Sequence, residues 1–581
     1  MLMAIHTDHK NIIDLVMGDL TQFHIPIYQR LYTWDSNNQV QKLLDDILNF
    51  GEEYKDNKRA EYYIGNVIVK NQTRGMVTER VVIDGQQRIT TSILILCAIR
   101  DIYRNKIKSE EGKRSADSIQ KHLYTQDDAE TKLKLNNMEH QQALTNLLSG
   151  MLQGTSADDK KTRYFKNYDY IHKYLSNMDE SNFNGFLDLL RRVKVVIIFL
   201  DEDQDENSVF ESINSLGKPL AGSDLIKNYL FTFKKYECSH HEENQLINLY
   251  TRTFEAQFKT EEYMEQALEN FFRDYIATQK QWLVKKDPKV VYYEFKGVIG
   301  EIPSIERLKE IIVDLAKWAL IYQVVKVKNH PDIDLNYIGY LRGSFGQYSV
   351  LMMNILNNYS HVESNELIID DPIAFNNALK AIVAYEASRF LAGYPSGEVV
   401  RFSPMVFKRL DSPEFDSNMG YGDRFLAFVA SAEEGYRLPS SKELKDSVVT
   451  GNLYTRKSQH LKRFLTLIEN MGKKECLNYE EDMKKAQIEH ILPQNPVPTQ
   501  WSSISHDDKE KYLHTLGNLT LTFDNQTLSN KPFSEKKIIL AEKSRINLNA
   551  ELLKYNEFNV ETIKTRAGDM LARFEKEFFN R

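Results

Sequence analysis

The most constraining stretch of the sequence is residues 81–91, Val-Val-Ile-Asp-Gly-Gln-Gln-Arg-Ile-Thr-Thr, in which an apolar run meets a polar turn and then a new apolar pattern. The continuous β-branched run Val81–Ile83 predicts a buried strand. Apolar residues then recur at helical spacing as far as Arg100, which predicts a helix. Asp84-Gly85 would form the turn, because glycine tolerates a positive φ. This segment therefore predicts a strand, a tight turn and a helix.

The turn carries residues suited to an anion. The backbone amides of Gln86, Gln87 and Arg88 would begin the helix with unpaired N–H groups, and such a helix start attracts anions. The planar fork of Arg88 suits phosphate oxygens, and the two glutamines can each donate to a ligand or orient a water. An Asp-Gly turn before a helix is also common in purely structural settings. Phosphate binding and a structural turn are therefore both open at this point.

The polar residues Tyr28-Gln29-Arg30 follow a predicted strand at Phe23–Ile27. With Tyr32 and Trp34 they suit a pocket in which an aromatic ring lies on a base while Arg30 meets phosphate, although the two aromatic residues could equally pack in the core. Residues 104–161 are charged and turn-rich, and we expect them to form a surface helical insertion. Four further elements are predicted around these segments: a helix at Asp8–Leu20, an amphipathic helix at Asn37–Tyr54, a hairpin of Tyr62–Val69 with Thr78–Ile83 turning at Asn71–Gly75, and a strand at Arg192–Leu200.

Length and charge limit the function classes. A chain of 581 residues is too long for one core, so two or three domains are expected. The net charge of −7 does not attract nucleic acid, so any nucleic-acid-binding face must be a local basic patch. The three cysteines form no CxxC pair, which fits a reducing cytoplasm. The segment that contains Cys238, His240 and His241 is more typical of a plain loop than of a zinc site. No window is long and apolar enough to predict a membrane span.

Between residues 235 and 435 the sequence shows helical periodicity without a catalytic constellation. We expect a spacer or sensing region here, ended by the polar stretch Glu433–Thr450. Its helices are predicted at Ile311–Lys326, Gly343–Asn357, Ala374–Phe390 and Phe425–Ala432. Six cations could contact phosphates or could simply be solvated: Arg342, Lys380, Arg389, Arg401, Lys408 and Arg409.

A second polar motif begins after a short predicted helix at Glu480–Ala486. Residues 488–494, Ile-Glu-His-Ile-Leu-Pro-Gln, are followed by 516–522, Leu-Gly-Asn-Leu-Thr-Leu-Thr, and by the polar segment 524–533. The order is acid-histidine, asparagine, asparagine. A one-metal nuclease needs these types: a neutral imidazole that takes a proton from water, an amide that holds the imidazole, and oxygen ligands for a hard cation. The alternative is a set of buried, hydrogen-bonded polar groups with a structural role.

The N-terminal motifs, residues 25–34 and 84–88, together with a second block at 210–220 and 223–228, resemble the N-terminal domain of GmrSD-type restriction proteins. The resemblance implies a ParB-like fold in which the Asp-Gly-Gln-Gln-Arg element serves nucleotide binding and hydrolysis. Asp224 could instead cap the helix that it starts. The implied nucleotide-binding residues are Tyr28, Gln29, Arg30, Asp84, Gly85, Gln86, Gln87, Arg88, Asn214, Asp224 and Lys227.

The C-terminal motifs resemble the His-Me finger (HNH) nuclease domain that ends GmrSD-type proteins. The resemblance implies that His490 is the general base, that Asn518 orients it, and that Glu489 and Asn525 bind the metal, with Asn530 as a competing ligand. The more familiar HNH pattern has Asp before the base and His at the last position. Glu489 and Asn525 depart from it, which leaves the identity of the metal ligands open.

We therefore expect a multidomain α+β protein: a ParB-like domain at 1–234, a mostly helical region at 235–435 and a ββα-metal (HNH) nuclease domain at 436–581. The expected function is NTP-regulated cleavage of modified DNA with Mg²⁺ or Mn²⁺, as in type IV restriction and phage defence, in the cytoplasm. The alternative is a ParB-like, nucleotide-dependent DNA-binding switch whose HNH-like end is structural. No Walker A sequence is present, which excludes a P-loop nucleotide site. DNA and a nucleoside triphosphate are the expected partners, and a homodimer stays open.

Overall fold

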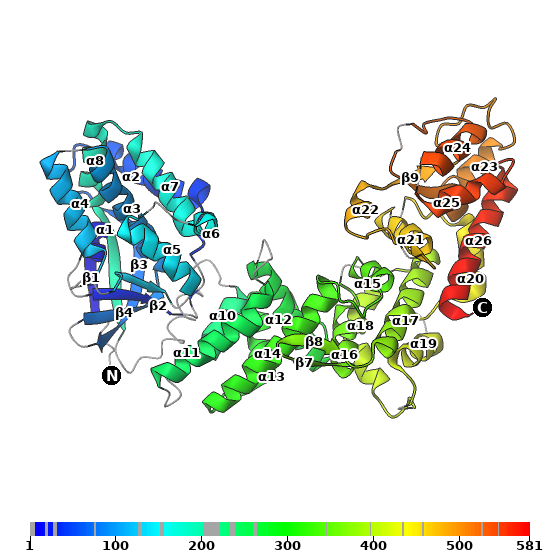
Figure 1. Ribbon diagram of the computed structural model, residues 1–581, viewed down its shortest axis with the longest axis horizontal. Coiled ribbons are helices and arrows are strands. Elements are labelled where there is room, and N and C mark those ends of the chain that lie inside the picture. Colours follow the sequence, from blue (N-terminus) through cyan, green and yellow to red (C-terminus); the bar gives the residue numbers. More distant parts are fainter. Residues whose placement is uncertain are drawn as a thin grey trace. The chain divides into compact units, whose positions relative to one another are not determined.

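The computed structural model describes residues 6–580 apart from 18–20, 27–28, 30–31, 75–76, 108, 126–129, 136–137, 152–155, 201–220, 232–238, 259–263, 344–345, 396, 417, 433–434, 456–457, 474, 525–526 and 544. The chain divides into two compact units, Met1–Ser239 and His240–Arg581 (Figure 1).

The first unit contains a six-stranded mixed sheet in the order β1-β6-β3-β4-β2-β5. β3 pairs antiparallel with β4 as the predicted hairpin, but β3 continues through the expected turn as far as Arg74. β2 runs parallel to β4, so the ends of these two strands lie at the same edge of the sheet. The strands are β1 (His6–Asn11), β2 (Thr21–Ile25), β3 (Tyr62–Arg74), β4 (Val77–Asp84), β5 (Leu133–Leu135) and β6 (Val193–Leu200).

The central helix of this unit is α3 (Gln86–Asn105), which packs against α1, α4 and α7. Its residues from Ile89 to Ile102 are buried almost without interruption, so α3 lies inside the core and not on one face of it. The other helices are α1 (Ile12–Met17), a π-helical turn (Ser36–Val40) that leads into α2 (Gln41–Glu53), α4 (Glu110–His122), α5 (Met138–Ser149), α6 (Ala157–Lys161), α7 (Arg163–Ser176), α8 (Glu180–Leu190) and α10 (Gly222–Leu230).

Two expectations for this unit are wrong. Residues 6–11 form a strand paired with β6, and the helix begins only at Ile12, where Asn11 Oδ1 accepts from the Asp14 amide at 2.8 Å. The segment 104–161 is not a surface insertion, because it supplies the sheet strand β5 and because Leu144 and Leu147 of α5 are fully buried in the core. Both errors concern pairing with residues far away in the chain. The sequence also predicts a helix that begins near Asn207, after the acidic run Asp201–Glu206, and this segment lies outside the described residues.

The first part of the second unit is almost entirely helical. Three of the four predicted helices are confirmed. The helix predicted to begin at Gly343 begins at Ser349 instead, because Gly343 is the C-cap of the preceding helix, α15. The elements are α11 (His240–Leu249), a π-helical and a 3₁₀ turn at Tyr250–Phe254 and Glu255–Phe258, α12 (Met264–Lys280), α13 (Pro288–Ile299), α14 (Ile305–Lys326), α15 (Leu335–Arg342), α16 (Ser349–Asn358), a small hairpin β7 (Ser360–Glu363) and β8 (Glu366–Ile369), α17 (Pro372–Leu391), α18 (Gly397–Leu410) and α19 (Tyr421–Ser431).

The cations considered in this region have mixed fates. Arg342 donates to the carbonyls of Val324, Val325 and Lys328, and the buried Arg389 donates to those of Pro395, Gly435 and Arg437. Lys380 pairs with Glu577 at 3.0 Å. These three are therefore structural, whereas Arg401, Lys408 and Arg409 are exposed on α18.

The polar stretch expected to mark a boundary contains a helix, α20 (Ser441–Thr450), which begins with a capping box of Ser440 and Glu443. α20 packs on the last helix, α26 (Val560–Phe579), as does α17. Helices from both sides of residues 435/436 thus pack on α26, and the domain boundary expected at this position stays a prediction. Between α20 and α26 lie α21 (Ser458–Asn470), α22 (Glu481–Lys485), β9 (Gln487–His490), α23 (His506–Tyr512), a 3₁₀ turn (Leu516–Asn518), β10 (Leu519–Thr522), α24 (Phe533–Lys543), α25 (Asn547–Ala550) and a 3₁₀ turn (Glu551–Lys554).

The C-terminal part contains two paired strands followed by a helix, with the short helix α23 and a 3₁₀ turn between the strands. β9 and β10 form an antiparallel pair in which His490 lies opposite Leu519, and α24 follows. A small apolar core that includes Ile491, Leu528 and Leu540 joins the hairpin to the helix. The predicted class, a multidomain α+β protein, is confirmed. None of the described helices is long and apolar enough to cross a membrane.

Candidate functional site

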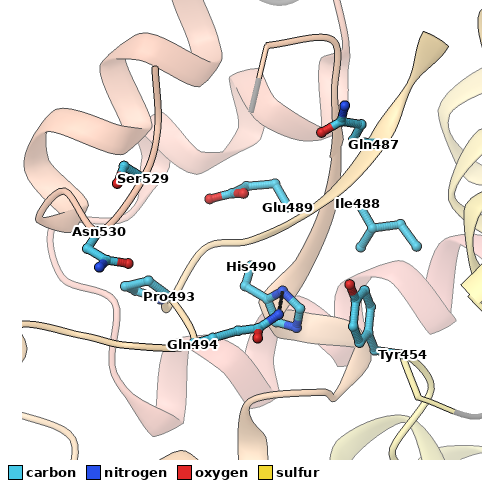
Figure 2. Close-up of a pocket in the computed structure, with 9 residues that line it drawn as sticks. All are labelled: Tyr454, Gln487, Ile488, Glu489, His490, Pro493, Gln494, Ser529 and Asn530. Carbon is cyan, nitrogen blue, oxygen red and sulfur yellow. Dashed lines mark hydrogen bonds between the residues drawn. The ribbon is translucent and has the colours of Figure 1, made fainter. Parts of the chain in front are cut away.

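An open pocket of about 400 Å³ lies on the C-terminal hairpin (Figure 2). Three of the predicted site residues, Glu489, His490 and Asn530, line it together. Adjacent residues of a strand point to opposite sides, and Figure 2 shows the Glu489 carboxylate on the side of Ser529 and Asn530 while the His490 ring lies beside Tyr454 and Gln494. The complete lining is Tyr454, Gln487, Ile488, Glu489, His490, Pro493, Gln494, Ser529 and Asn530.

The imidazole of His490 is 5% exposed at the end of β9. Its Nε2 lies 3.0 Å from Nδ1 of His514, and its Nδ1 lies 3.5 Å from the Gln494 amide nitrogen. Burial lowers the pKa of His490 to about 4, and the nearby His514 and Lys536 act in the same direction. His490 is therefore neutral at pH 7, as a proton acceptor must be.

The sequence did not single out His514, the residue that touches the His490 ring. The ring of Tyr454 lies parallel to that of His514, with centroids 5.3 Å apart, and meets the His490 ring edge-on at 4.6 Å. These three rings come from separate parts of the chain. The sequence signal for His514 was its position four residues before Asn518, just ahead of the motif segment 516–522.

Asn518 is completely buried, and its amide bonds to backbone instead of to the imidazole. Its Oδ1 accepts from the Leu492 amide at 2.7 Å, while its Nδ2 donates to the carbonyls of Leu492 at 3.1 Å and Leu513 at 2.8 Å. Asn518 thus ties the turn after His490 to the residue before His514. The expected orientation of the base by Asn518 is therefore indirect and passes through the backbone at both histidines.

The turn that carries Asn518 packs against α26 and is hydrogen-bonded to it. The Arg566 guanidinium, 2% exposed, donates to the carbonyls of Gly517 and Leu519 at 2.9 Å each. A Cβ on Gly517 would come within 1.9 Å of the Ile563 carbonyl oxygen. Glycine is therefore required at this position by the close approach of the helix.

Glu489 forms a buried ion pair with Lys536 of α24. Lys536 Nζ lies 2.6 Å from Glu489 Oε1 and donates to the His490 carbonyl at 2.9 Å. Burial raises the pKa of Glu489, and Lys536 opposes that shift; burial likewise lowers the pKa of Lys536 against the effect of Glu489. Lys536 was not predicted as this partner, because it lies 46 residues after His490 and beyond the last polar segment of the motif, 524–533.

The oxygen donors of the pocket suit a hard divalent cation. Glu489 has a second carboxylate oxygen, and the Asn530 amide lies in the same pocket. Mg²⁺ accepts one or two carboxylates and completes its shell with water and phosphate oxygens. Among the described residues no group of three or more His, Cys, Asp or Glu side chains is arranged to hold a metal. Asn525, the other predicted ligand, lies outside the described residues.

The N-terminal motif forms the predicted strand, turn and helix. β4 ends at Asp84, Gly85 has φ +93° and α3 begins at Gln86. A Cβ on Gly85 would come within 2.9 Å of Val67, so only glycine fits this turn. Gln87 Oε1 accepts from the amides of Thr33 and Trp34 at 2.9 and 3.2 Å.

The two N-terminal motif blocks meet at the edge where β2 and β4 end. Besides the Gln87 bonds, Gln29 Nε2 donates to the Ile83 carbonyl at 2.6 Å. Tyr32 is buried, bonds to Thr91 Oγ1 at 2.8 Å and packs on Tyr164, as expected for a core residue. The predicted residues Tyr28, Arg30 and Asn214 lie outside the described part of the chain.

The guanidinium of Arg88 points at backbone carbonyls. Its Nε donates to Ile64 at 2.7 Å and its Nη1 to Asn66 at 2.9 Å, where the pairing of β3 with β6 shifts register. The fork therefore holds β3 in this structure. On α10, Asp224 is in the first turn and Lys227 in the last; Ala221 occupies the N-cap position, so Asp224 is not the N-cap residue of this helix.

Two family models match the chain, one at each end. Residues 12–231 match the model described as GmrSD restriction endonuclease, N-terminal domain. Residues 438–573 match the model described as GmrSD restriction endonucleases, C-terminal domain. No curated protein matches the chain. The two matched regions contain all the motifs from which the candidate sites were predicted.

Proposed function

The chain belongs to the GmrSD restriction endonucleases, and from this premise we propose that it hydrolyses modified DNA at the pocket around His490 with the help of Mg²⁺ or Mn²⁺. We further propose that a nucleoside triphosphate, bound and hydrolysed at the Asp84–Arg88 turn of the first unit, regulates this cleavage. The observation that carries the proposal is a neutral, buried histidine beside an acid in a pocket open to solvent.

The described residues divide the work of phosphodiester hydrolysis as follows. His490 accepts a proton from water while the water oxygen bonds to phosphorus, the bond to the leaving sugar oxygen breaks, and that oxygen takes up a proton. His514 supports the tautomer in which His490 Nε2 donates to His514 Nδ1, which leaves the other nitrogen of His490 able to accept a proton. A divalent cation, held by Glu489 and Asn530, would polarise the phosphate and stabilise the leaving oxygen.

For the nucleotide, the helix start of α3 is the supporting feature. The first turn of a helix carries a partial positive charge that favours phosphate, and Gly85, with φ +93°, makes the tight turn that leads from β4 into this helix. Nε and Nη1 of Arg88 already donate to the carbonyls of Ile64 and Asn66, so these two nitrogens could bind a phosphate only by leaving those carbonyls. Its contribution in the observed conformation is therefore to hold β3 beside the turn.

One observation favours the second candidate, a nucleotide-dependent DNA-binding switch whose C-terminal pocket is structural. Lys536 occupies one oxygen of Glu489 and is itself fully buried, so part of the expected metal site is already neutralised within the protein. A lysine and a bound cation would repel each other across the same carboxylate.

The two candidates are separated by digesting matched DNA substrates: unmodified DNA, DNA with glucosylated hydroxymethylcytosine and phosphorothioate DNA. Each is incubated with Mg²⁺, Mn²⁺ or EDTA, with and without nucleoside triphosphate. The nuclease proposal expects cation-dependent cleavage of a modified substrate at a rate that nucleotide changes. Nucleotide-dependent DNA binding without cleavage under every condition would favour the switch, and identical cleavage of all substrates would remove the modification dependence.

A further inference from the structure

Residues 280–296 of the second unit form a basic and aromatic surface, which we call the lysine hairpin. α12 ends at Lys280, Gln281 turns the chain with φ +57°, and α13 begins at Pro288. The segment holds five lysines against two acids in a chain whose net charge is −7. It is therefore a local basic patch of the kind that an acidic DNA-binding protein needs.

The lysine hairpin is fixed on the protein by its inner face. Val291, Tyr292 and Phe295 of α13 are buried, and the Phe295 ring lies 5.5 Å from that of Phe272 on α12. An ion pair between Lys280 and Glu294 joins the two helices where they meet the turn. The outer face is therefore presented on a rigid support.

Large apolar side chains are exposed on that outer face. Trp282 is 48% exposed, Leu283 53% and Tyr293 61%. Tyr293 lies one helical turn after Lys289 on α13, so the two side chains are neighbours on the surface. Lys280 Nζ lies 5.1 Å from the centroid of the Trp282 ring. Aromatic rings and ammonium groups are thus interleaved on one surface.

The three lysines between the two aromatic residues carry uncompensated charge. Lys285, Lys286 and Lys289 are exposed, and none of them forms an ion pair with another residue in the part of the chain that the structure describes. The two acids of the segment are engaged elsewhere: Asp287 caps α13 by accepting from the Val290 amide at 3.0 Å, and Glu294 pairs with Lys280.

We propose that the lysine hairpin binds DNA, with Lys285, Lys286 and Lys289 on backbone phosphates and Trp282 as a platform for a base or sugar. Lysines that neutralise phosphates release counterions, and aromatic rings stack on bases regardless of sequence. This inference rests on DNA being the substrate, as proposed above. The region between the two matched domains would then bind the DNA, which the rest of the chain, with its net negative charge, does not attract.

The test is fluorescence anisotropy of labelled DNA, both a 30-base-pair duplex and the corresponding single strand, with the full-length protein in EDTA between 50 and 200 mM salt. The triple variant Lys285→Gln, Lys286→Gln, Lys289→Gln should bind with a shallower slope of log K against log salt. The expected difference is about 2.7 on the duplex, at roughly 0.9 for each phosphate no longer neutralised, and about 2.1 on the single strand, at roughly 0.7 each. A control with three exposed lysines of the first unit, Lys55→Gln, Lys58→Gln and Lys121→Gln, should keep the slope.

Trp282 supplies a second, independent readout. Trp318 and Trp501 are buried, whereas Trp282 is half-exposed, so DNA bound at the lysine hairpin should quench a fluorescence component that Trp282→Phe lacks. Trp282→Ala should weaken single-strand binding about fivefold or more, from the usual strength of base stacking. Circular dichroism of each variant establishes that the fold is kept.

An unchanged salt slope in the lysine variant, or the same change in the control, would overturn the proposal. The proposal would also be overturned if the lysine hairpin bound phosphatidylserine vesicles or polyglutamate more tightly than DNA, since the partner would then be a membrane or an acidic protein. Binding through the hairpin without any cleavage would contradict the proposed function and leave this inference standing. Cleavage together with unaltered binding by the lysine variant would do the reverse.

Discussion

Replacing Lys536 with methionine should destabilise the folded protein, because the buried carboxylate of Glu489 would lose its positively charged partner. The ammonium group of Lys536 is fully buried, lies 2.6 Å from Glu489 Oε1 and contacts the His490 carbonyl. Methionine keeps most of the apolar stem. Breaking a buried ion pair on one side costs about 3–5 kcal/mol, because the remaining charge loses its partner.

Hydrogen exchange of the β9 and β10 amides, measured by mass spectrometry, reads this cost locally and independently of the first unit. A loss of about 3–5 kcal/mol corresponds to protection lower by roughly two to almost four powers of ten. The control is Lys531→Met, which breaks an exposed pair with Glu535 just before the same helix. Exposed pairs contribute about 0.2–1 kcal/mol, so the control should change protection by less than a factor of about ten.

The double variant Glu489→Gln, Lys536→Met removes both charges and should regain most of the lost protection. If Lys536→Met behaves like Lys531→Met, the carboxylate of Glu489 does not depend on the lysine and the ion pair is not a feature of the folded protein. If the double variant stays as unstable as Lys536→Met, the loss comes from packing and the electrostatic reasoning is refuted.

Three further predictions concern the same pocket. His514→Ala should lower kcat of DNA cleavage about tenfold or more with little change in KM, and His514→Asn, whose Oδ1 can accept from His490 Nε2, should restore part of it; equal losses in both variants would contradict this role. Gly517→Ala should destabilise the hairpin by about 1–3 kcal/mol or more in urea unfolding, because the helix α26 must move away from the new Cβ, whereas Gly568→Ala, with nothing within 4 Å, should not. Because the pKa of His490 is lowered to about 4 in the folded protein, the unfolded chain binds a proton more tightly than the folded one. The free energy of unfolding should therefore fall by up to about 1.4 kcal/mol per pH unit as the pH drops from about 6.5 towards 4. If His490→Gln shows the same pH dependence as the wild type, His490 is not the group with the lowered pKa.

Local patterns predicted the parts of the fold that local physics decides. The run Val81–Ile83 with the turn at Gly85 was correct because β-branched residues and a glycine at positive φ leave few alternatives. By contrast, residues 6–11 carry no strand pattern of their own and become a strand only by pairing with β6. Pairing with a distant partner is a tertiary effect that a window of sequence does not contain.

The candidate sites divide in the same way. Adjacent Glu489 and His490 were found because they are consecutive in a motif, and the structure brings both into one pocket with Asn530. His514 and Lys536 were missed because their contacts with His490 and Glu489 span 24 and 47 residues. The expected roles of Arg88 and Asn518 assumed ligand or side-chain partners. Both residues instead bond to backbone carbonyls, which have no sequence signature.

The role of His490 as the base of a DNA-cleaving site is tested by one ratio of cleavage rates. Single-turnover cleavage of a modified DNA substrate with Mg²⁺ is compared between His490→Ala and His506→Ala, the second being an exposed histidine of α23 at the start of that helix. We expect wild-type rates for His506→Ala and a loss of at least about a hundredfold for His490→Ala. Equal rates in the two variants, with both folded, would contradict it.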